Sequence, residues 1–203
     1  MSGWLETSNV KAKWTAVGGS EGNTNAAAFA EASITIISIF DLISGMGSAK
    51  SDMEGNAKTL QKAAAGGDAS LQSLVEAELN GKDDKAIKKI VNDGKTTTCA
   101  LLWLVRALTF IKVMLEVMVA NPGKSMKECV GDGYAASLKP YHNMLVKGVF
   151  SAALNMAPKR EDFVKKLGAG EQEVMGEFSE MLKILTPLLD SSRAFLVSKG
   201  VEK

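Results

Sequence analysis

Several residue types on which common functions depend are scarce in this sequence. There are two cysteines and one histidine among 203 residues. These are too few of the usual ligands to build a four-ligand zinc site, and neither cysteine belongs to a C-x-x-C pair. We therefore expect no metal and no cofactor. Cys99 and Cys129 are interpreted as buried free thiols in a reducing compartment, which places the protein in the cytoplasm.

Aromatic residues, prolines and an excess of one charge are also lacking. Aromatics make up 6% of the chain, four residues are proline, and 24 Lys and Arg oppose 23 Asp and Glu for a net charge of +1. A nucleic-acid-binding protein concentrates positive charge on one face, so we expect no nucleic-acid partner. The shortage of proline, together with abundant helix formers, favours an all-α fold. Residues 1–16 have no apolar core of signal-peptide length, which argues against secretion.

Apolar periodicity and capping residues predict about eight helices in one domain. We expect residues 1–23 to be an irregular segment broken by Gly18, Gly19 and Gly22, with its two tryptophans docked onto the core. Residues 24–203 are expected to form the single domain. Helical patterns cover residues 25–43, 51–65, 68–80, 82–91, 96–120, 125–138, 141–156, 160–167 and 171–198.

The most apolar part of the chain is residues 96–120. Between Ala100 and Ala120 the only charges are Arg106, Lys112 and Glu116. The segment is long enough to span a bilayer, but three separated charges argue against that. A helix that is apolar nearly all round is typical of the centre of a globular core.

Three polar residues follow one face of the helix predicted at 51–65. Asp52 and Asn56 are four residues apart and therefore lie one turn apart, and Thr59 continues the same face. Asp52 has an alternative role near a helix N-terminus, where a carboxylate interacts favourably with the dipole. His142, the only histidine, follows Tyr141 at the start of an apolar helix. The alternative interpretation is a structural histidine whose hydrogen bonds are all made within the protein.

Trp103 and Arg106 share a face of the central helix because they are three residues apart. Trp103 is interpreted either as a core residue or as a platform for a ligand. Arg106 is expected to pair with a buried carboxylate, for which Asp41 is the candidate. Spacing alone does not decide between these interpretations.

Taken in order, the segments resemble the glycolipid transfer protein family over roughly residues 25–200. The resemblance depends on four separated blocks that occur in the right order. These are FD at 40–41, DMEGN at 52–56, LLWLVRAL at 101–108, and YH at 141–142 continuing to FSAAL at 150–154 and AP at 157–158.

The resemblance implies a two-layer helical sandwich that encloses the chains of a sphingolipid and holds its headgroup at the surface. It implies that Asp52 binds the ceramide amide N–H and sugar hydroxyls, and that Asn56 also reaches the sugar. Trp103 would lie beneath the first sugar ring, and His142 would donate to the ceramide carbonyl. These roles suit the side chains, since a carboxylate only accepts hydrogen bonds and a neutral imidazole can donate one.

Two positions depart from the family pattern. Thr59 stands where glycolipid-binding members carry a lysine, and Met144 stands where many members carry a tryptophan that touches the membrane. Members that bind phosphate-bearing ceramides have basic residues at the positions of Asn56 and Trp103. Because both residues are neutral here, a glycosylceramide is the expected ligand. The alternatives are ceramide-phosphate transfer and a sphingolipid sensor or adaptor that does not transfer its lipid.

An enzyme is not expected, since Asp52 and His142 are the only plausible acid–base groups and no nucleophile motif is present. The expected partners are the glycosphingolipid and, transiently, a membrane surface. We expect membrane contact near residues 141–147, where apolar and basic residues occur together. A soluble carrier of this kind is expected to be a monomer.

Overall fold

A computed structural model describes residues 2–18, 23–168 and 170–202, and the regular structure within these ranges is helical. The expected all-α fold is confirmed, and the helices are somewhat more numerous than the eight expected. They are α1 (Trp4–Ser8), α2 (Val10–Val17), α3 (Ala26–Ile37), η1 (Ser38–Leu42), α4 (Gly47–Ala63), α5 (Leu71–Leu79), α6 (Asp84–Val91), α7 (Thr97–Ala120), α8 (Met126–Ala136), η2 (Lys139–Tyr141), α9 (Met144–Leu154), α10 (Arg160–Leu167) and α11 (Glu171–Ser198).

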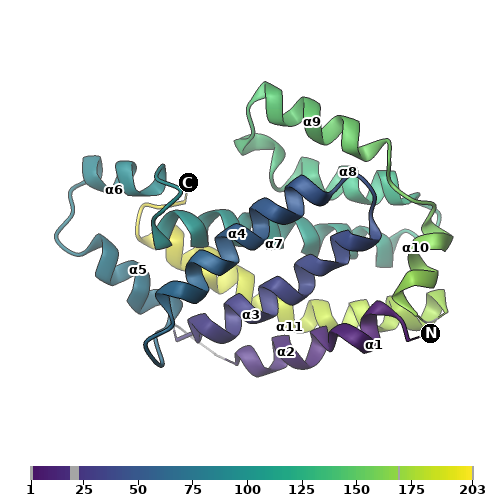
Figure 1. Ribbon diagram of the computed structural model, residues 1–203, viewed down its shortest axis with the longest axis horizontal. Coiled ribbons are helices and arrows are strands. Elements are labelled where there is room, and N and C mark those ends of the chain that lie inside the picture. Colours follow the sequence, from purple (N-terminus) through teal and green to yellow (C-terminus); the bar gives the residue numbers. More distant parts are fainter. Residues whose placement is uncertain (1, 19–22, 169, 203) are drawn as a thin grey trace.

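The helices form two layers around α7. Helices α3 and α4 pack against each other in front of α7, α8 and α11, as Figure 1 shows. Helices α5 and α6 lie at one end of the molecule, and α10 lies at the other. Helix α9 runs along the outside of α8. The two-layer helical sandwich expected from the sequence is therefore confirmed.

Helix α7 is the centre of the core. It contacts α8, α11, α4 and α5, and most of its apolar side chains are buried. Among the described residues it is the one helix long and apolar enough to cross a membrane, but its most apolar stretch is mainly buried inside the fold. Its N-terminus is capped by Thr96 and by Glu78, whose carboxylate accepts hydrogen bonds from the N–H groups of Thr97 and Thr98. The interpretation as a core helix is confirmed.

The expectation of an irregular segment at residues 1–23 was wrong for most of that stretch. Residues 4–8 and 10–17 are the helices α1 and α2, whereas Gly19 and Gly22 lie outside the described residues. Both tryptophans are docked as expected, since Trp14 is fully buried and the Trp4 indole N–H donates to Ser38 Oγ at 2.8 Å. Such short helices are marginal alone, so packing of the tryptophans stabilises them.

Several expected helices have different bounds, and the one expected at 51–65, for example, begins at Gly47. The stretch 25–43 is helical, but the α-helix ends at Ile37 and continues as a 3-10 helix to Leu42. The stretch 141–156 begins as a helix only at Met144, because Asn143 is the N-cap and its side chain accepts from the Val146 N–H. Pro140 lies in the short η2 instead. The last helix has the expected bounds and continues through Pro187.

Helices α7 and α8 approach closely at Gly133. A Cβ at this position would lie 3.0 Å from the Phe110 carbonyl oxygen and 3.1 Å from the Met114 nitrogen. At Gly131, two residues earlier on α8 and on nearly the opposite side of the helix, the nearest atom would be Leu154 Cδ1 at 3.9 Å. The absence of a side chain at Gly133 thus allows the two helix backbones to pack against each other.

We expect Gly133→Ala to destabilise the protein by about 1–2 kcal/mol, because overpacking against backbone outweighs the gain in helix propensity. The matched variant Gly131→Ala should instead stabilise it by about 0.5–1 kcal/mol. Both free energies of unfolding are measured by urea denaturation followed by circular dichroism. Equal stability of the two variants would contradict the close approach.

Candidate functional site

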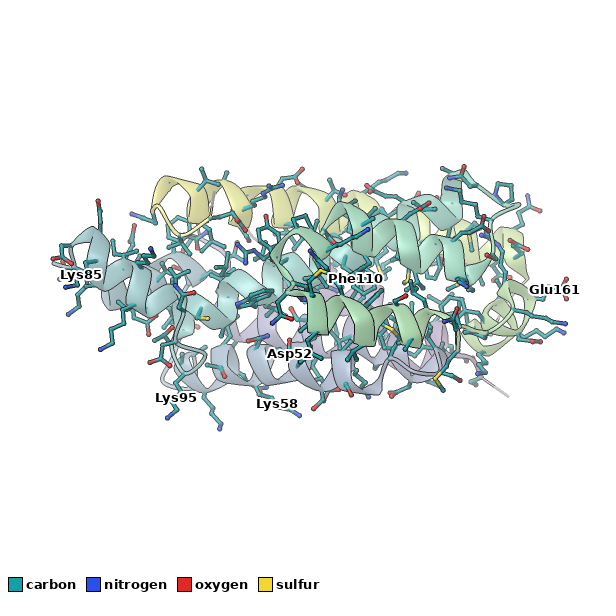
Figure 2. All side chains as sticks on the ribbon, turned by 90° about the horizontal axis from the view of Figure 1, so that it is seen from above. Asp52, Lys58, Lys85, Lys95, Phe110 and Glu161 are labelled. Atoms are coloured by element: carbon teal, nitrogen blue, oxygen red, sulfur yellow. The ribbon has the colours of Figure 1, made fainter. Side chains whose placement is uncertain are left out.

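A cavity of about 810 Å³ opens between α4 and α9. Its walls come from α4, from the turn between α6 and α7, from the first half of α7, from the segment that joins η2 to α9, and from α9 itself. Figure 2 shows Asp52 in the interior of the view, whereas Lys58, Lys85, Lys95 and Glu161 extend from the edges of the molecule. The cavity therefore lies where α9 stands away from α4.

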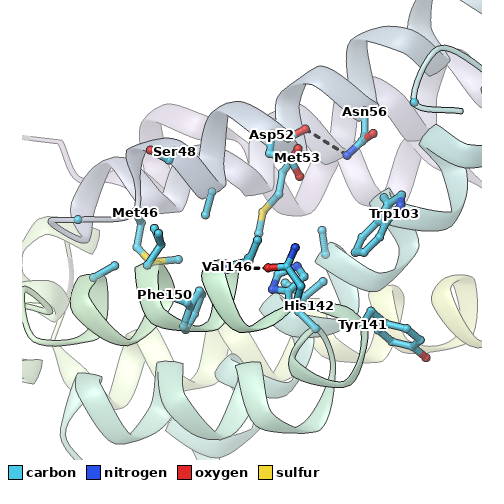
Figure 3. Close-up of a pocket in the computed structure, with 18 of the residues that line it drawn as sticks. Met46, Ser48, Asp52, Met53, Asn56, Trp103, Tyr141, His142, Val146 and Phe150 are labelled. Carbon is cyan, nitrogen blue, oxygen red and sulfur yellow. Dashed lines mark hydrogen bonds between the residues drawn. The ribbon is translucent and has the colours of Figure 1, made fainter. Parts of the chain in front are cut away.

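Four of the five residues expected in the site line this cavity: Asp52, Asn56, Trp103 and His142. Figure 3 shows them at one end of the cavity, on three separate parts of the chain. The fifth, Thr59, is not among the lining residues, and its hydroxyl donates to the main-chain oxygen of Gly55 at 3.0 Å. The structure thus brings four expected residues together and leaves Thr59 outside.

Asp52 and Asn56 are presented by one face of α4, as their spacing predicted. The Asn56 amide donates one hydrogen bond to the main-chain carbonyl of Asp52 at 3.1 Å, which orients the amide along the helix (Figure 3). Asp52 lies in the second turn of α4, since the helix begins at Gly47 rather than at residue 51. Its carboxylate therefore faces the cavity and does not cap the helix.

His142 is held by Tyr134, a residue that sequence reasoning did not single out. The Tyr134 hydroxyl lies 3.0 Å from His142 Nδ1, and the Tyr134 ring stacks on Phe150 at a centroid distance of 3.6 Å. Burial lowers the pKa of His142, with the nearby Asp52 carboxylate acting in the opposite direction. The imidazole is therefore neutral near pH 7, and a Tyr134 hydroxyl that donates to Nδ1 leaves a proton on Nε2.

Trp103 is half-buried and contacts the last residue of η2 and the residue that follows it. Its ring stacks near His142 at 5.9 Å between centroids and meets Tyr141 edge to face at 6.4 Å. It is thus both a packing residue and a wall of the cavity. One position further along the same face, Arg106 pairs with Glu202 and not with Asp41, which instead pairs with Lys50. The expected partner of Arg106 was wrong.

The rest of the cavity wall is largely apolar. It includes Met46, Met53, Val146, Phe150 and Met156. The apolar stretches 34–43, 101–119 and 145–154 contribute unequally to this wall. The stretch 145–154 contributes most, and the stretch 101–119 contributes Trp103 and Ala107. Residues 34–43 do not line the cavity, because this stretch packs into the core, where Phe40 stacks on Phe110.

Both cysteines are free and buried, as expected. Cys99 lies in the cavity wall, and burial raises the pKa of its thiol. The pKa of Cys129 is also raised by burial, against the opposing effect of the neighbouring Arg160 guanidinium. Both side chains therefore stay as neutral thiols and contribute apolar packing.

Polar groups lie at one end of a largely apolar cavity in a helical protein. Such a cavity is suited to bind an amphipathic molecule with a polar head. The comparisons with known proteins agree with this class. Residues 24–169 match the family described as Glycolipid transfer protein (GLTP). A glycolipid transfer protein of Aureobasidium melanogenum is 32% identical over 195 residues, which cover 94% of this chain and 92% of the relative. The chain belongs to the glycolipid transfer protein family.

Solved structures show the same fold. HET-C2, a fungal glycolipid transfer protein, superimposes with a TM-score of 0.76 at 32% identity, with 89% of each chain covered. Human ceramide-1-phosphate transfer protein in complex with 2:0 ceramide-1-phosphate gives a TM-score of 0.83 at 18% identity, with 97% of each chain covered. At that identity the second likeness concerns the fold alone.

We expect the pKa of His142 to lie below the ordinary value of about 6.5, and Asp52→Asn to lower it further because the carboxylate favours the charged ring. Since this is the only histidine, its ring signals titrate alone in an NMR experiment. A pKa at or above the ordinary value would contradict the buried geometry.

The same shift makes stability depend on pH. The unfolded state binds the proton more readily than the folded state, so the contribution of a neutral His142 to stability is present above about pH 6.5 and is lost as the pH falls. His142→Gln should reduce this dependence in urea unfolding measured between about pH 7.5 and pH 5.

Proposed function

We propose that the protein binds a sphingolipid, with a glycosylceramide as the preferred ligand, and transfers it between membranes. The observation that carries the proposal is the meeting of Asp52, Asn56, Trp103 and His142 at one end of a cavity whose other walls are largely apolar. The names of the relatives in the family support it, since they are described as glycolipid transfer proteins.

Each part of such a lipid has a matching part of the cavity. The Asp52 carboxylate accepts from the amide N–H and from sugar hydroxyls, while Asn56 offers both a donor and an acceptor. The half-buried Trp103 ring offers a flat face to the first sugar. His142 donates from Nε2 to the amide carbonyl. The chains lie along the apolar wall, where each buried methylene contributes about 0.8 kcal/mol.

A sugar is preferred over a phosphate because Asn56 and Trp103 carry no charge. A phosphate dianion buried at this end of the cavity needs basic partners, and the two positions do not supply them. Thr59 lies outside the cavity, so we assign it no direct contact with the headgroup. The proposal for the site thus depends on four residues rather than five.

We propose that α9 and the residues before it contact the membrane. Met144 and Leu145 are 82% and 77% exposed at the first turn of α9, beside the cavity, and Lys147 follows two residues after Leu145. Apolar side chains beside a basic one suit the boundary between headgroups and acyl chains. Met144 supplies apolar contact here, without the interfacial preference that a tryptophan would have.

We further propose that the carrier acts as a monomer in the cytoplasm and catalyses no reaction. The buried free thiols support a reducing compartment. Residues 24–203 are proposed to form a single lipid-transfer domain, with α1 and α2 packed onto it through Trp4 and Trp14. A carrier that must present its cavity to a bilayer needs the exposed face of α9 free.

The first test is transfer of fluorescent lipids between vesicles, with galactosylceramide, ceramide phosphate and phosphatidylcholine compared. We expect galactosylceramide to move fastest and Trp103→Ala to slow it about tenfold, equivalent to about 1.4 kcal/mol. Thr59→Ala is the matched control outside the cavity and should change the rate less than twofold. Circular dichroism confirms that both variants fold.

Other outcomes of this experiment are informative. Faster transfer of ceramide phosphate than of galactosylceramide would overturn the headgroup assignment. Tight binding of galactosylceramide with negligible transfer would favour a lipid sensor over a carrier. Transfer of phosphatidylcholine at the same rate would contradict recognition of a sphingolipid by Asp52 and His142.

The membrane surface is tested with Met144→Ser combined with Leu145→Ser. We expect this variant to lose about tenfold in partitioning onto vesicles, because two large apolar side chains no longer enter the interface. Val197→Ser is the matched control, since Val197 is also exposed, at 50%, but lies near the end of α11. Vesicle sedimentation measures both. Equal loss in the two variants would argue against a specific role of α9.

A further inference from the structure

A buried ion pair lies behind Trp103. Arg106 donates from Nε to Glu202 Oε2 at 2.8 Å and from Nη2 to Glu202 Oε1 at 2.9 Å, so the two groups meet through two parallel hydrogen bonds. Their side chains are 14% and 3% exposed. A carboxylate this deeply buried is held by its partners, and removal of one partner leaves an uncompensated charge.

The turn after α11 places Glu202 there. Gly200 has a positive φ of 69°, and its N–H bonds to the Val197 carbonyl while the Val201 N–H bonds to the Leu196 carbonyl. These two bonds are those of a Schellman motif, which ends a helix and turns the chain back over it. Val201 is buried as a result, and Glu202 enters the space beside α7.

Arg106 in turn contacts two aromatic walls of the cavity. Its guanidinium carbon lies 3.5 Å from the centroid of the Tyr141 ring and 5.0 Å from that of Trp103. The Tyr141 hydroxyl also donates to Glu202 Oε1 at 3.4 Å. Glu202 therefore holds Tyr141 directly and, through Arg106, both rings. Neither Arg106 nor Glu202 lines the cavity itself.

We propose that Glu202 is a positioning residue that sets the headgroup preference. It holds Arg106 against Tyr141 and so fixes the rings of Trp103 and Tyr141 as neutral walls of the cavity. It also keeps the Arg106 guanidinium from pairing with a phosphate headgroup. The lipid part of this inference rests on the proposed function. The physical reason is that a guanidinium forms paired hydrogen bonds to carboxylate and phosphate in the same geometry, so Glu202 occupies the edge that a phosphate would use.

The decisive variant is Glu202→Gln, which keeps the shape of the side chain and removes its charge. Arg106 then has no anionic partner in this pair, and its charge acts on the headgroup end of the cavity. We expect the ratio of ceramide-phosphate transfer to galactosylceramide transfer to rise about tenfold, equivalent to about 1.4 kcal/mol. A loss only of stability would slow both lipids by the same factor, and that result would overturn the proposal.

A matched control is available at the other end of the molecule. Arg160 and Glu171 form another Arg–Glu pair at 2.6 Å, with Arg160 largely buried and Glu171 exposed, where α10 meets the start of α11. Glu171→Gln should leave the transfer ratio unchanged. The double variant Arg106→Gln with Glu202→Gln removes both charges, and its ratio should return toward that of the wild type. A ratio as high as in Glu202→Gln would contradict a role for the Arg106 charge.

A lipid-free readout tests the positioning separately. The indole N–H signal of Trp103, assigned by its absence in Trp103→Phe, should shift in Glu202→Gln and stay unchanged in Glu171→Gln. An unchanged signal in both variants would overturn the positioning role. If the wild type transfers no glycosylceramide, the proposed function fails, while the Trp103 signal still decides whether Glu202 positions the wall.

Discussion

The structure depends on one constraint, which is that α7 is apolar nearly all round and must be covered on every side. Helices α4, α8, α11 and α5 supply this cover, and a two-layer arrangement is the result. The half-buried positions of α7 include Trp103, Arg106 and Thr109, which are spaced three apart and form a single stripe. The site begins where this stripe meets the cavity, so the same constraint that builds the core also positions the site.

A series of aromatic contacts connects that site with the core. Trp103 stacks near His142, which contacts Tyr134, and Tyr134 stacks on Phe150. The series continues from Phe150 to Phe110 and from Phe110 to Phe40. Rings packed in this way restrict one another's rotamers, so the polar groups of the site are preorganised rather than free to reorient.

Much of the fold was predictable because it follows from local patterns. The helices at Thr97–Ala120 and Glu171–Ser198 are long, periodic and bounded by capping residues, and their bounds were expected almost to the residue. Helices α1 and α2 were missed because they are short and lie among glycines, and their stability comes from the burial of Trp4 and Trp14. A local pattern does not report such tertiary packing.

The candidate site likewise has features that local spacing predicted and features that only the fold determines. Asp52 with Asn56, and Trp103 with Arg106, were predicted to share faces because helical spacing decides this. Thr59 was included on the same grounds, but the cavity ends one turn earlier, at Asn56. The partner of Arg106 was wrong because spacing cannot rank carboxylates that lie far away in the chain, and Glu202 is 96 residues distant. Tyr134 was missed for the same reason, since only the fold brings it to His142.

Two basic side chains at this end of the cavity contribute no net positive charge, for different reasons. Burial lowers the pKa of His142 and keeps its ring neutral, whereas Arg106 keeps its charge and is offset by Glu202. What remains at this end of the cavity is the Asp52 carboxylate, the Asn56 amide and a flat indole. Under the proposed function this set favours a headgroup that carries many hydroxyls and no charge, because each hydroxyl can donate to the carboxylate while a phosphate would face it unpaired. The selectivity for the headgroup then depends on the neutral state of His142 and the paired state of Arg106 as much as on the groups that bind the headgroup.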